Sequence, residues 1–522
     1  MVESHDTTPL TSFNVPTLKV IVVGAGPAGL LASILLLRRN ESLLSNSDAN
    51  DGTRVTPCRY HVTIVDPGLD YGSLEEQELI RHRSWMVGLT AHGLTSVQQI
   101  PRLYEDYIEK LGIHCTGITI GMGRRKVSFA IPERMRRENI AVDRNFVCAA
   151  LARYLREHFL DSGNLTLKYE TNALLVDGEY RRLLVRSVDD TTGNMNAVMS
   201  LDYDLLLGCD GIRSVVRNAF MTHHRDFTFS IQDAFNVGKS LHITKPPTIE
   251  EGHLFLLFNC LPNMVSYTSP ERGGQLNFAG AYNRNKPCDP EMMSDDPKVI
   301  KEYLEKHFTV FEMDFEEAAQ AWVKQTWNTL QQVHCNFYHS TKLQALLLGD
   351  AAHATVPNLG QGMNTALADA IALNELLDLY NDDWESVLPA FSKERVKEGN
   401  ALTDLSFHTF SLNPIMQLEI VIRQNLRRIF NRFFPNWLVD IEPIAAVGQG
   451  MKLSEAYDRV SKLGYLNRSR RINDEMMRRH FEKQSGMIRD EKSSSHLVSF
   501  IALPLAAVAL FYFRDSIIIM RR

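Results

Sequence analysis

A glycine-rich turn between an apolar run and a helical pattern limits the possible folds of this chain more than any other feature. Residues 19–23 form a short β-branched run, Gly24-Ala25-Gly26-Pro27-Ala28-Gly29 follows, and residues 30–37 continue at helical spacing. Such glycines allow a tight turn, close approach of the backbone to a pyrophosphate, and close packing of helix on strand. We therefore expect Gly24, Gly26 and Gly29 to bind a dinucleotide at a helix start, within a Rossmann-type α/β fold.

An acid that binds ribose usually follows such a turn after about 20 residues. Here the next strand is expected at residues 61–65 and ends at Asp66, much further along the chain. The intervening residues 40–58 are rich in Ser, Asn and Asp, which indicates a surface loop. We predict that Asp66 binds ribose; the alternative is a solvated strand end.

A second motif combines an apolar strand with an aspartate and a glycine. Residues 204–207 are followed by Gly208-Cys209-Asp210-Gly211, and a helix is expected to open at Ser214. Asp210 and Gly211 can present a carboxylate and backbone amides to the same dinucleotide. Alternatively, Asp210 or Ser214 only caps the helix.

A third motif follows the buried run 345–348. Gly349 and Asp350 end that strand, and Gly360-Gln361-Gly362-Met363-Asn364 opens a further helix. Asp350 is predicted to accept hydrogen bonds from ribityl hydroxyls. A helix start carries partial positive charge, which suits the pyrimidine edge of a reduced, anionic flavin. Together the three motifs predict a flavin dinucleotide site.

The order of these motifs, over residues 19–377, resembles the FAD-dependent aromatic hydroxylases, also called class A flavoprotein monooxygenases. Residues 82–90, 142–145, 349–353, 360–364 and 402–406 resemble kynurenine 3-monooxygenase more narrowly. The resemblance implies bound FAD, NADPH or NADH as co-substrate, O2, and a small aromatic substrate. The cofactor then performs the redox chemistry, and no metal is required.

The same resemblance assigns further residues. Arg83, Gly88 and Arg144 would contact FAD together with Gly362 and Met363, and Asn364 would act catalytically on the substrate side of the flavin. For either arginine, the alternative is a surface ion pair. We expect His353 to be structural. A non-catalytic, membrane-associated protein on a degenerate flavoprotein fold is disfavoured by the intact glycines.

The sequence departs from the resemblance where a substrate carboxylate would bind. The stretch Cys115-Thr116-Gly117-Ile118-Thr119 lacks the usual arginine, and Ile131-Pro132 is followed by Glu133 rather than tyrosine. Binding a carboxylate requires a fixed cation, for which Arg124 or Arg125 is available. A related hydroxylase or epoxidase with a more apolar substrate is therefore the alternative.

Composition sets broader limits. The 522 residues are 44% hydrophobic, which suffices for two cores, and a net charge of −6 argues against nucleic acid as a partner. The seven cysteines contain no CxxC pair, which predicts reduced thiols in a protein that faces the cytosol.

We expect the following organisation. An FAD-binding domain comprises residues 18–226 and 339–382, residues 227–338 form a substrate domain with an antiparallel sheet, residues 383–483 are helical, and residues 484–496 are a linker.

The C-terminus is predicted to form a membrane tail anchor. Residues 497–513 carry no charge and would span about 26 Å as a helix, close to a bilayer core of about 30 Å. Basic residues upstream, from Arg468 to Lys483, favour a catalytic body in the cytosol. The mitochondrial outer membrane is preferred over the endoplasmic reticulum. The alternatives are a buried core helix for the apolar segment and a solvated helix face for the basic residues.

Overall fold

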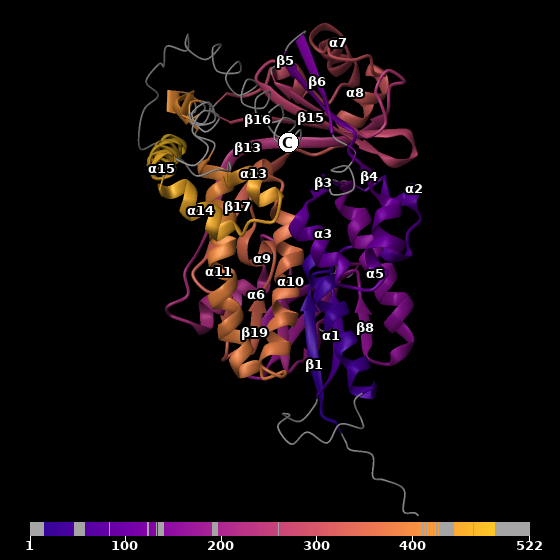
Figure 1. The fold of residues 1–522 in the computed structure, drawn as a ribbon, viewed down its shortest axis with the longest axis vertical. Coiled ribbons are helices and arrows are strands. Elements are labelled where there is room, and N and C mark those ends of the chain that lie inside the picture. Colours follow the sequence, from indigo (N-terminus) through magenta and orange to yellow (C-terminus); the bar gives the residue numbers. More distant parts are fainter. Residues whose placement is uncertain are drawn as a thin grey trace, which may run out of the picture.

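The computed structural model describes residues 15–485 of the chain (Figure 1). Within that range it leaves out residues 46–57, 83, 123–124, 132, 134–139, 190–196, 259, 285, 410–411, 414, 417, 421, 424–425, 427–442 and 463. No helix in the described part is long and apolar enough to cross a membrane. The predicted span at 497–513 lies outside the described residues.

A six-stranded sheet forms the lower half of the molecule in Figure 1, with strand order β18-β19-β12-β1-β2-β8. Its strands pair in parallel except for β18, which is antiparallel to β19. Buried parallel strands require near-continuous apolar runs, and residues 20–23 of β1 are almost fully buried. The bounds are β1 Thr17–Val23, β2 Arg59–Val65, β8 Leu165–Lys168, β12 Leu205–Gly208, β18 His339–Ser340 and β19 Ala345–Leu347.

Helices pack around this sheet, and α1 contacts both α5 and α10. Helix α1 continues to Ser45, so the first part of the predicted loop at 40–58 is helical instead. Within this extension, the side chain of Asn40 hydrogen-bonds the backbone N–H and C=O of Tyr60 at 2.8 and 2.9 Å, which ties the helix to β2. The helices are α1 Pro27–Ser45, α2 Glu76–Leu79, α3 Ala91–Gln98, α5 Arg144–Phe159, α6 Val215–His223, α9 Asp350–His353, α10 Gly362–Leu379 and α11 Trp384–His408.

A seven-stranded sheet, called here the roof sheet, lies above, with order β17-β13-β16-β15-β14-β5-β6. Leu241, Phe278 and Trp322 belong to the core between one face of this sheet and helices α7 (Pro297–His307) and α8 (Phe315–Lys324). The strands are β5 Gly117–Met122, β6 Arg125–Ala130, β13 Phe229–Thr244, β14 His253–Phe258, β15 Met264–Glu271, β16 Gln275–Asn283 and β17 Asn328–Cys335.

The roof sheet differs from the sequence-based expectation in two respects. Strands β5 and β6 come from before α5 and were not expected in this sheet. In addition, β5 pairs with β14 in parallel, so the sheet is mixed rather than wholly antiparallel. Ile118 and Ile120 of β5 pack with apolar residues of β14, and burying this apolar area favours the pairing.

Two further small sheets are present among the described residues. They have the orders β11-β10-β9 and β3-β7-β4. Their strands are β3 Met86–Leu89, β4 Ile113–His114, β7 Ile140–Asp143, β9 Thr171–Asp177, β10 Arg182–Ser187 and β11 Met199–Asp202.

The C-terminal helices α14 (Leu453–Lys462) and α15 (Tyr465–Gln484) pack beside α11, and α13 (Pro443–Gly448) packs on α14. Asp404 of α11 forms an ion pair with Arg470 of α15 and lies 3.1 Å from His334 of β17. Several of the basic residues noted in the sequence therefore have acidic partners; Arg468, Arg478 and Arg479 pair with Glu419 or Glu475.

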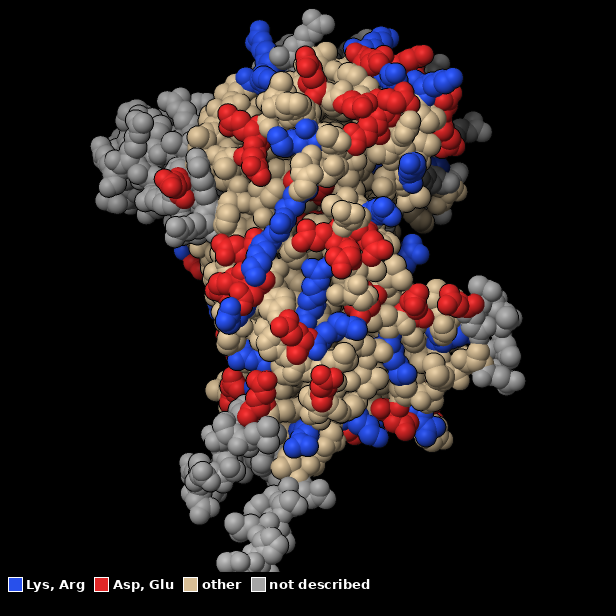
Figure 2. All heavy atoms as spheres, turned by 90° about the vertical axis from the view of Figure 1, so that its right-hand side faces the viewer, with Lys and Arg blue, Asp and Glu red and all other residues tan. Residues whose placement is uncertain are grey.

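Surface charges are mixed. On the face shown in Figure 2, Lys and Arg side chains alternate with Asp and Glu over most of the area, and acidic side chains gather over the upper part.

A buried ionic cluster joins α9, α10 and α11. Asp369 of α10 accepts hydrogen bonds from Arg395 Nε at 2.7 Å and from the backbone N–H of Gly349 at 2.9 Å, and lies 2.7 Å from His353 Nε2. Burial opposes the charge of Asp369, but His353 and Arg395 outweigh it and hold the pKa of the carboxyl at about 2. The cluster fixes the third glycine motif to the helices behind it, and His353 is buried within it.

We predict that Asp369→Asn destabilises the protein by about 3 to 5 kcal/mol, because it leaves the Arg395 charge buried without a counter-charge. Urea unfolding measures this change. Asp378→Asn is the control: Asp378 pairs with Arg39 at the surface, and its loss should cost less than about 1 kcal/mol.

The sign of the pH dependence follows from the lowered pKa of Asp369. Its stabilisation should be complete above the ordinary aspartate pKa of about 4. It should be lost as the pH falls towards about 2. Equal stability of the two variants would contradict this account.

Candidate active site

The sheet order brings the three motifs together. Strands β19, β12, β1 and β2 are neighbours and run parallel, so the turns that follow them meet at one edge of the sheet. This is where open α/β sheets bind their ligands.

The glycines of the first turn have different surroundings. Gly24 has φ +106°, and a Cβ atom there would lie 2.2 Å from the carbonyl oxygen of Cys209. A Cβ on Gly29 would lie 2.1 Å from the oxygen of Gly24. A Cβ on Gly26, in contrast, would meet only Arg144 Nη2 at 3.6 Å. Gly24 and Gly29 are therefore required by packing, whereas Gly26 leaves space for a ligand.

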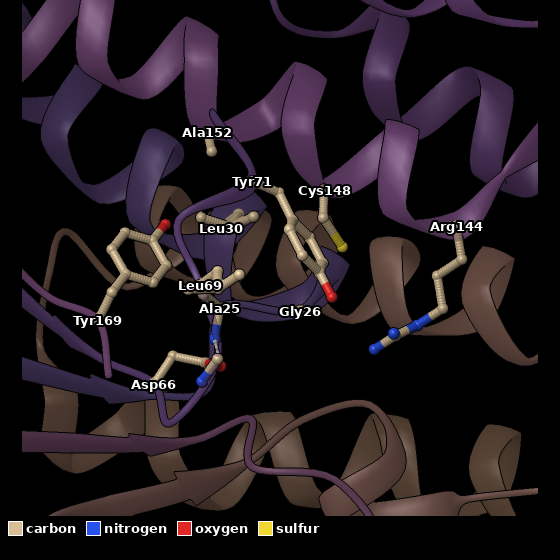
Figure 3. Close-up of a pocket in the computed structure, with 11 residues that line it drawn as sticks. Ala25, Gly26, Leu30, Asp66, Leu69, Tyr71, Arg144, Cys148, Ala152 and Tyr169 are labelled. Atoms are coloured by element: carbon tan, nitrogen blue, oxygen red, sulfur yellow. Dashed lines mark hydrogen bonds between the residues drawn. The ribbon is translucent and has the colours of Figure 1, made fainter. Parts of the chain in front are cut away.

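Arg144 faces this space from the first turn of α5. Its guanidinium has no hydrogen bond or ion pair with any residue that the structure describes, so the alternative of a surface ion pair is not observed there. Figure 3 shows the side chain pointing into the pocket from one side, with Asp66 and Tyr169 on the opposite side. An unpaired guanidinium beside an open glycine turn suits a pyrophosphate.

The cavity itself has a volume of about 120 Å³. It is lined by Ala25, Gly26, Leu30, Asp66, Gly68, Leu69, Tyr71, Arg144, Cys148, Ala152 and Tyr169.

Asp66 lies at the end of β2, as predicted. Its two carboxylate oxygens accept hydrogen bonds from the backbone N–H groups of Ala25 and Gly68, each at 2.6 Å. The carboxylate thus holds the glycine turn and also lines the cavity. Its contact with ribose stays a prediction.

Asp210 caps a helix, and its predicted contact with the dinucleotide stays a prediction. One oxygen caps α6, accepting from the N–H of Val215 at 2.6 Å. The other, Oδ1, is buried and has no hydrogen-bond partner among the described residues. Ser214 caps the same helix through the N–H of Arg217. Neighbouring Gly211 has φ +72° and open space around its Cβ position, so this turn has both an acceptor and room for a ligand.

The third motif presents Asp350 at the start of α9. Its side chain is exposed and forms no hydrogen bond or ion pair within the described part of the chain. Gly349, with φ +58°, is enclosed by Ala28 and Ala366. Gly362 begins α10, and Met363 is half-buried beside it.

Asn364 is fully buried, and its amide is occupied. Its Oδ1 accepts from the N–H of Thr90 at 3.0 Å, and its Nδ2 donates to the carbonyl oxygens of Gly88 and Gly360 at 2.9 and 3.0 Å. The side chain thus ties β3 to the start of α10. Its predicted catalytic role stays a prediction, and so does the contact of exposed Gly88 with FAD. Arg83 lies outside the described residues.

These residues fit FAD. Gly26 leaves the backbone open. Among the residues that the structure describes, Arg144 has no ion-pair partner, and Asp210 Oδ1 and Asp350 have no hydrogen-bond donor. When bound, FAD supplies the redox chemistry, and the chain supplies binding, orientation and charge.

Comparison with known proteins agrees with this geometry. Residues 145–406, just over half of the chain, match the family model described as FAD binding domain. The chain belongs to this family. It is an FAD-dependent monooxygenase of the aromatic hydroxylase class, a class that uses NAD(P)H as co-substrate.

Curated relatives of the monooxygenase are distant. Violacein synthase of Chromobacterium violaceum is 24% identical over 462 residues, covering 85% of this chain and 96% of that enzyme. Kynurenine 3-monooxygenase of Legionella pneumophila is 26% identical over 439 residues, covering 78% and 84%. The pig (Sus scrofa) kynurenine 3-monooxygenase is 25% identical, with a match that covers 46% of this chain and only 50% of that enzyme.

Solved structures share the fold. A tetrameric form of 2-methyl-3-hydroxypyridine-5-carboxylic acid oxygenase aligns with TM-score 0.55 and 19% identity, covering 75% of the monooxygenase and 90% of that chain. Klebsiella pneumoniae HpxO complexed with FAD and uric acid aligns with TM-score 0.52 and 16% identity, covering 74% and 86%.

Several residues at and behind this site were not predicted from the sequence. Tyr71 and Tyr169 line the cavity, but neither belongs to a recognisable motif. Asp369 had a usable signal, because a single acid within the apolar stretch 366–373 indicates a buried partner.

We predict that Gly26→Val folds but binds FAD at least about tenfold more weakly, because its side chain fills the space left for the pyrophosphate. Flavin fluorescence titration of the apoprotein measures this, with circular dichroism to confirm folding. Gly29→Ala is the contrast, since its Cβ meets backbone and should lower stability itself. Stoichiometric flavin in purified Gly26→Val would contradict the assigned role of this turn.

Proposed function

We propose that this monooxygenase hydroxylates a small aromatic molecule with NAD(P)H and O2, and that kynurenine is the first substrate to test. The single observation that carries the proposal is the convergence of Gly26, Arg144, Asp210 and Asp350 at one sheet edge below a roof sheet. The similarity to kynurenine 3-monooxygenases supports the choice of kynurenine as the first substrate to test.

A kynurenine carboxylate would need a cation. Arg125 is exposed at the start of the edge strand β6, and Arg124 lies outside the described residues. The stretch 115–119 runs into β5 without a basic residue. If kynurenine binds, these two arginines are the nearest candidates in sequence.

An apolar ring is the second candidate, and one part of the roof sheet favours it. In β14, Phe255 and Leu257 point into the core with α7 and α8, so the alternating Leu254 and Leu256 face the opposite side. There they form an apolar cluster with Ile118, Ile120, Phe129, Ile131 and Phe258.

We predict that kynurenine stimulates NAD(P)H oxidation by the holoenzyme and that the product gains one oxygen atom by mass spectrometry. Replacing Arg124 and Arg125 by Gln should weaken apparent kynurenine affinity about thirtyfold or more, since loss of a charge-assisted pair costs about 2 to 5 kcal/mol. Arg182→Gln, at an exposed pair with Asp202, is the control and should change nothing.

The two candidate substrates give opposite results in this screen. If an uncharged aromatic compound stimulates NAD(P)H oxidation and is hydroxylated, and kynurenine does neither, the apolar ring replaces kynurenine as the proposed substrate.

We further propose that residues 497–513 anchor the protein in a membrane, with the mitochondrial outer membrane preferred and the catalytic part in the cytosol. A chain truncated after Lys492 should be recovered in the soluble fraction and still oxidise NAD(P)H through FAD. The full chain should resist extraction with alkaline carbonate; release by that treatment would count against a spanning helix.

A further inference from the structure

Three titratable side chains from three elements meet where the roof sheet touches the FAD-binding part. Asp143 ends β7, His242 lies on β13, and Glu271 ends β15. One nitrogen or oxygen atom of each lies within 4.8 Å of those of the other two, and all three side chains are largely buried. None of them lines the cavity described above.

Strand alternation explains how His242 reaches this place. Its neighbours Leu241 and Ile243 point into the core beneath α7 and α8, so His242 points to the other face of the roof sheet. Strand β15 contacts β7 on that face.

The contacts within the cluster are specific. His242 Nδ1 donates to both carboxylate oxygens of Glu271, at 2.8 and 3.0 Å. Its Nε2 is buried without a hydrogen-bond partner among the described residues. Asp143 accepts from the N–H of Asn145 at 2.7 Å as the N-cap of α5, and from the hydroxyl of Ser84.

The charges of the cluster are linked. Burial, with a contribution from the charge of Glu271, raises the pKa of Asp143 to about 6. Burial lowers the pKa of His242, but its hydrogen bond to Glu271 and the two acidic charges outweigh burial and raise it overall. Burial, with a contribution from the charge of Asp143, raises the pKa of the Tyr267 hydroxyl on β15. When His242 is protonated, it is the cation that offsets the two buried acids.

Asp143 connects this cluster to the flavin site. The next residue is Arg144, whose backbone N–H donates to the carbonyl oxygen of Trp85 at 3.1 Å and whose guanidinium faces the cavity. Asp143 is the N-cap of α5, so its position constrains the first turn of that helix, which carries the cation beside Gly26.

We propose that Asp143, His242 and Glu271 form a proton-sharing clasp between the roof sheet and α5, and that they are positioning residues that hold Arg144 for the FAD pyrophosphate. The proposal rests on the predicted role of Arg144. Loss of the His242 proton leaves two buried, like-charged carboxylates, which repel each other and open the clasp.

The experiment compares FAD dissociation constants of His242→Gln, Asp143→Asn and the double variant, in the full chain, at about pH 5.5, 7 and 8.5. Asn is itself a good N-cap, so Asp143→Asn removes the charge and keeps the cap. His253→Gln is the matched control, because His253 lies on β14 of the same sheet and bonds Thr119, away from the cluster.

We expect His242→Gln to weaken FAD binding roughly tenfold at neutral pH, within the range typical of coupling between sites. Lowering the pH, which protonates Asp143, or adding Asp143→Asn should restore most of this loss. If His242 only filled space, neither low pH nor Asp143→Asn would restore FAD affinity in the His242→Gln variant.

Two results would overturn the proposal. One is a loss in His242→Gln that neither low pH nor Asp143→Asn repairs. The other is one equivalent of zinc or manganese in the purified protein that disappears in His242→Gln, because a metal would then be the cation. Arg144→Gln tests separately whether Arg144 binds the FAD pyrophosphate: unchanged FAD affinity in this variant would contradict that role. The melting temperatures of the other variants would still show whether Asp143, His242 and Glu271 stabilise the contact between the roof sheet and α5.

Discussion

Parallel pairing of β19, β12, β1 and β2 is the constraint on which the rest of this molecule depends. The four strands are distant in sequence, yet their carboxyl ends lie along one edge. A glycine or aspartate placed just after each strand therefore faces the same space. No single motif would make a dinucleotide site. The register of strand pairing places the motifs side by side, because Val23 lies opposite both Val65 and Gly208.

The buried charges behind this edge determine how rigidly it is held. Asp369 binds Gly349, His353 and Arg395, so the third motif is fixed to two helices. In contrast, Arg144 and Asp350 in front of the edge have no ion-pair or hydrogen-bond partner for their side chains in the part of the chain that the structure describes. Charged groups behind the sheet edge are thus paired with each other, whereas those in front of it are open to a ligand. This arrangement is expected of a preorganised site.

The local parts of the fold were predictable from the sequence because strand-turn-helix units follow from adjacent residues. Strand β1, the start of α10 and the cap at Ser214 lie where their patterns indicated. The long-range parts were not. Nothing local in residues 117–130 shows that β5 and β6 join a sheet formed mainly by residues after 228. Likewise, the meeting of Asp143, His242 and Glu271 depends on how two sheets lie against each other. Asn364 illustrates a third difficulty: its motif was readable, but its hydrogen bonds to residues 88 and 90 were not.

The insertion of β5 and β6 into the roof sheet has a consequence for how this protein can evolve or be redesigned. The chain enters the roof, returns to the lower sheet through α5, and enters the roof again, so neither sheet is a contiguous segment. Its folding must close long loops before either core is complete. Exchanging the roof to alter substrate choice would require two segments to be replaced together, 117–130 and 229–335. Single-segment recombination at the apparent boundary would leave an edge of β14 unpaired and open to aggregation.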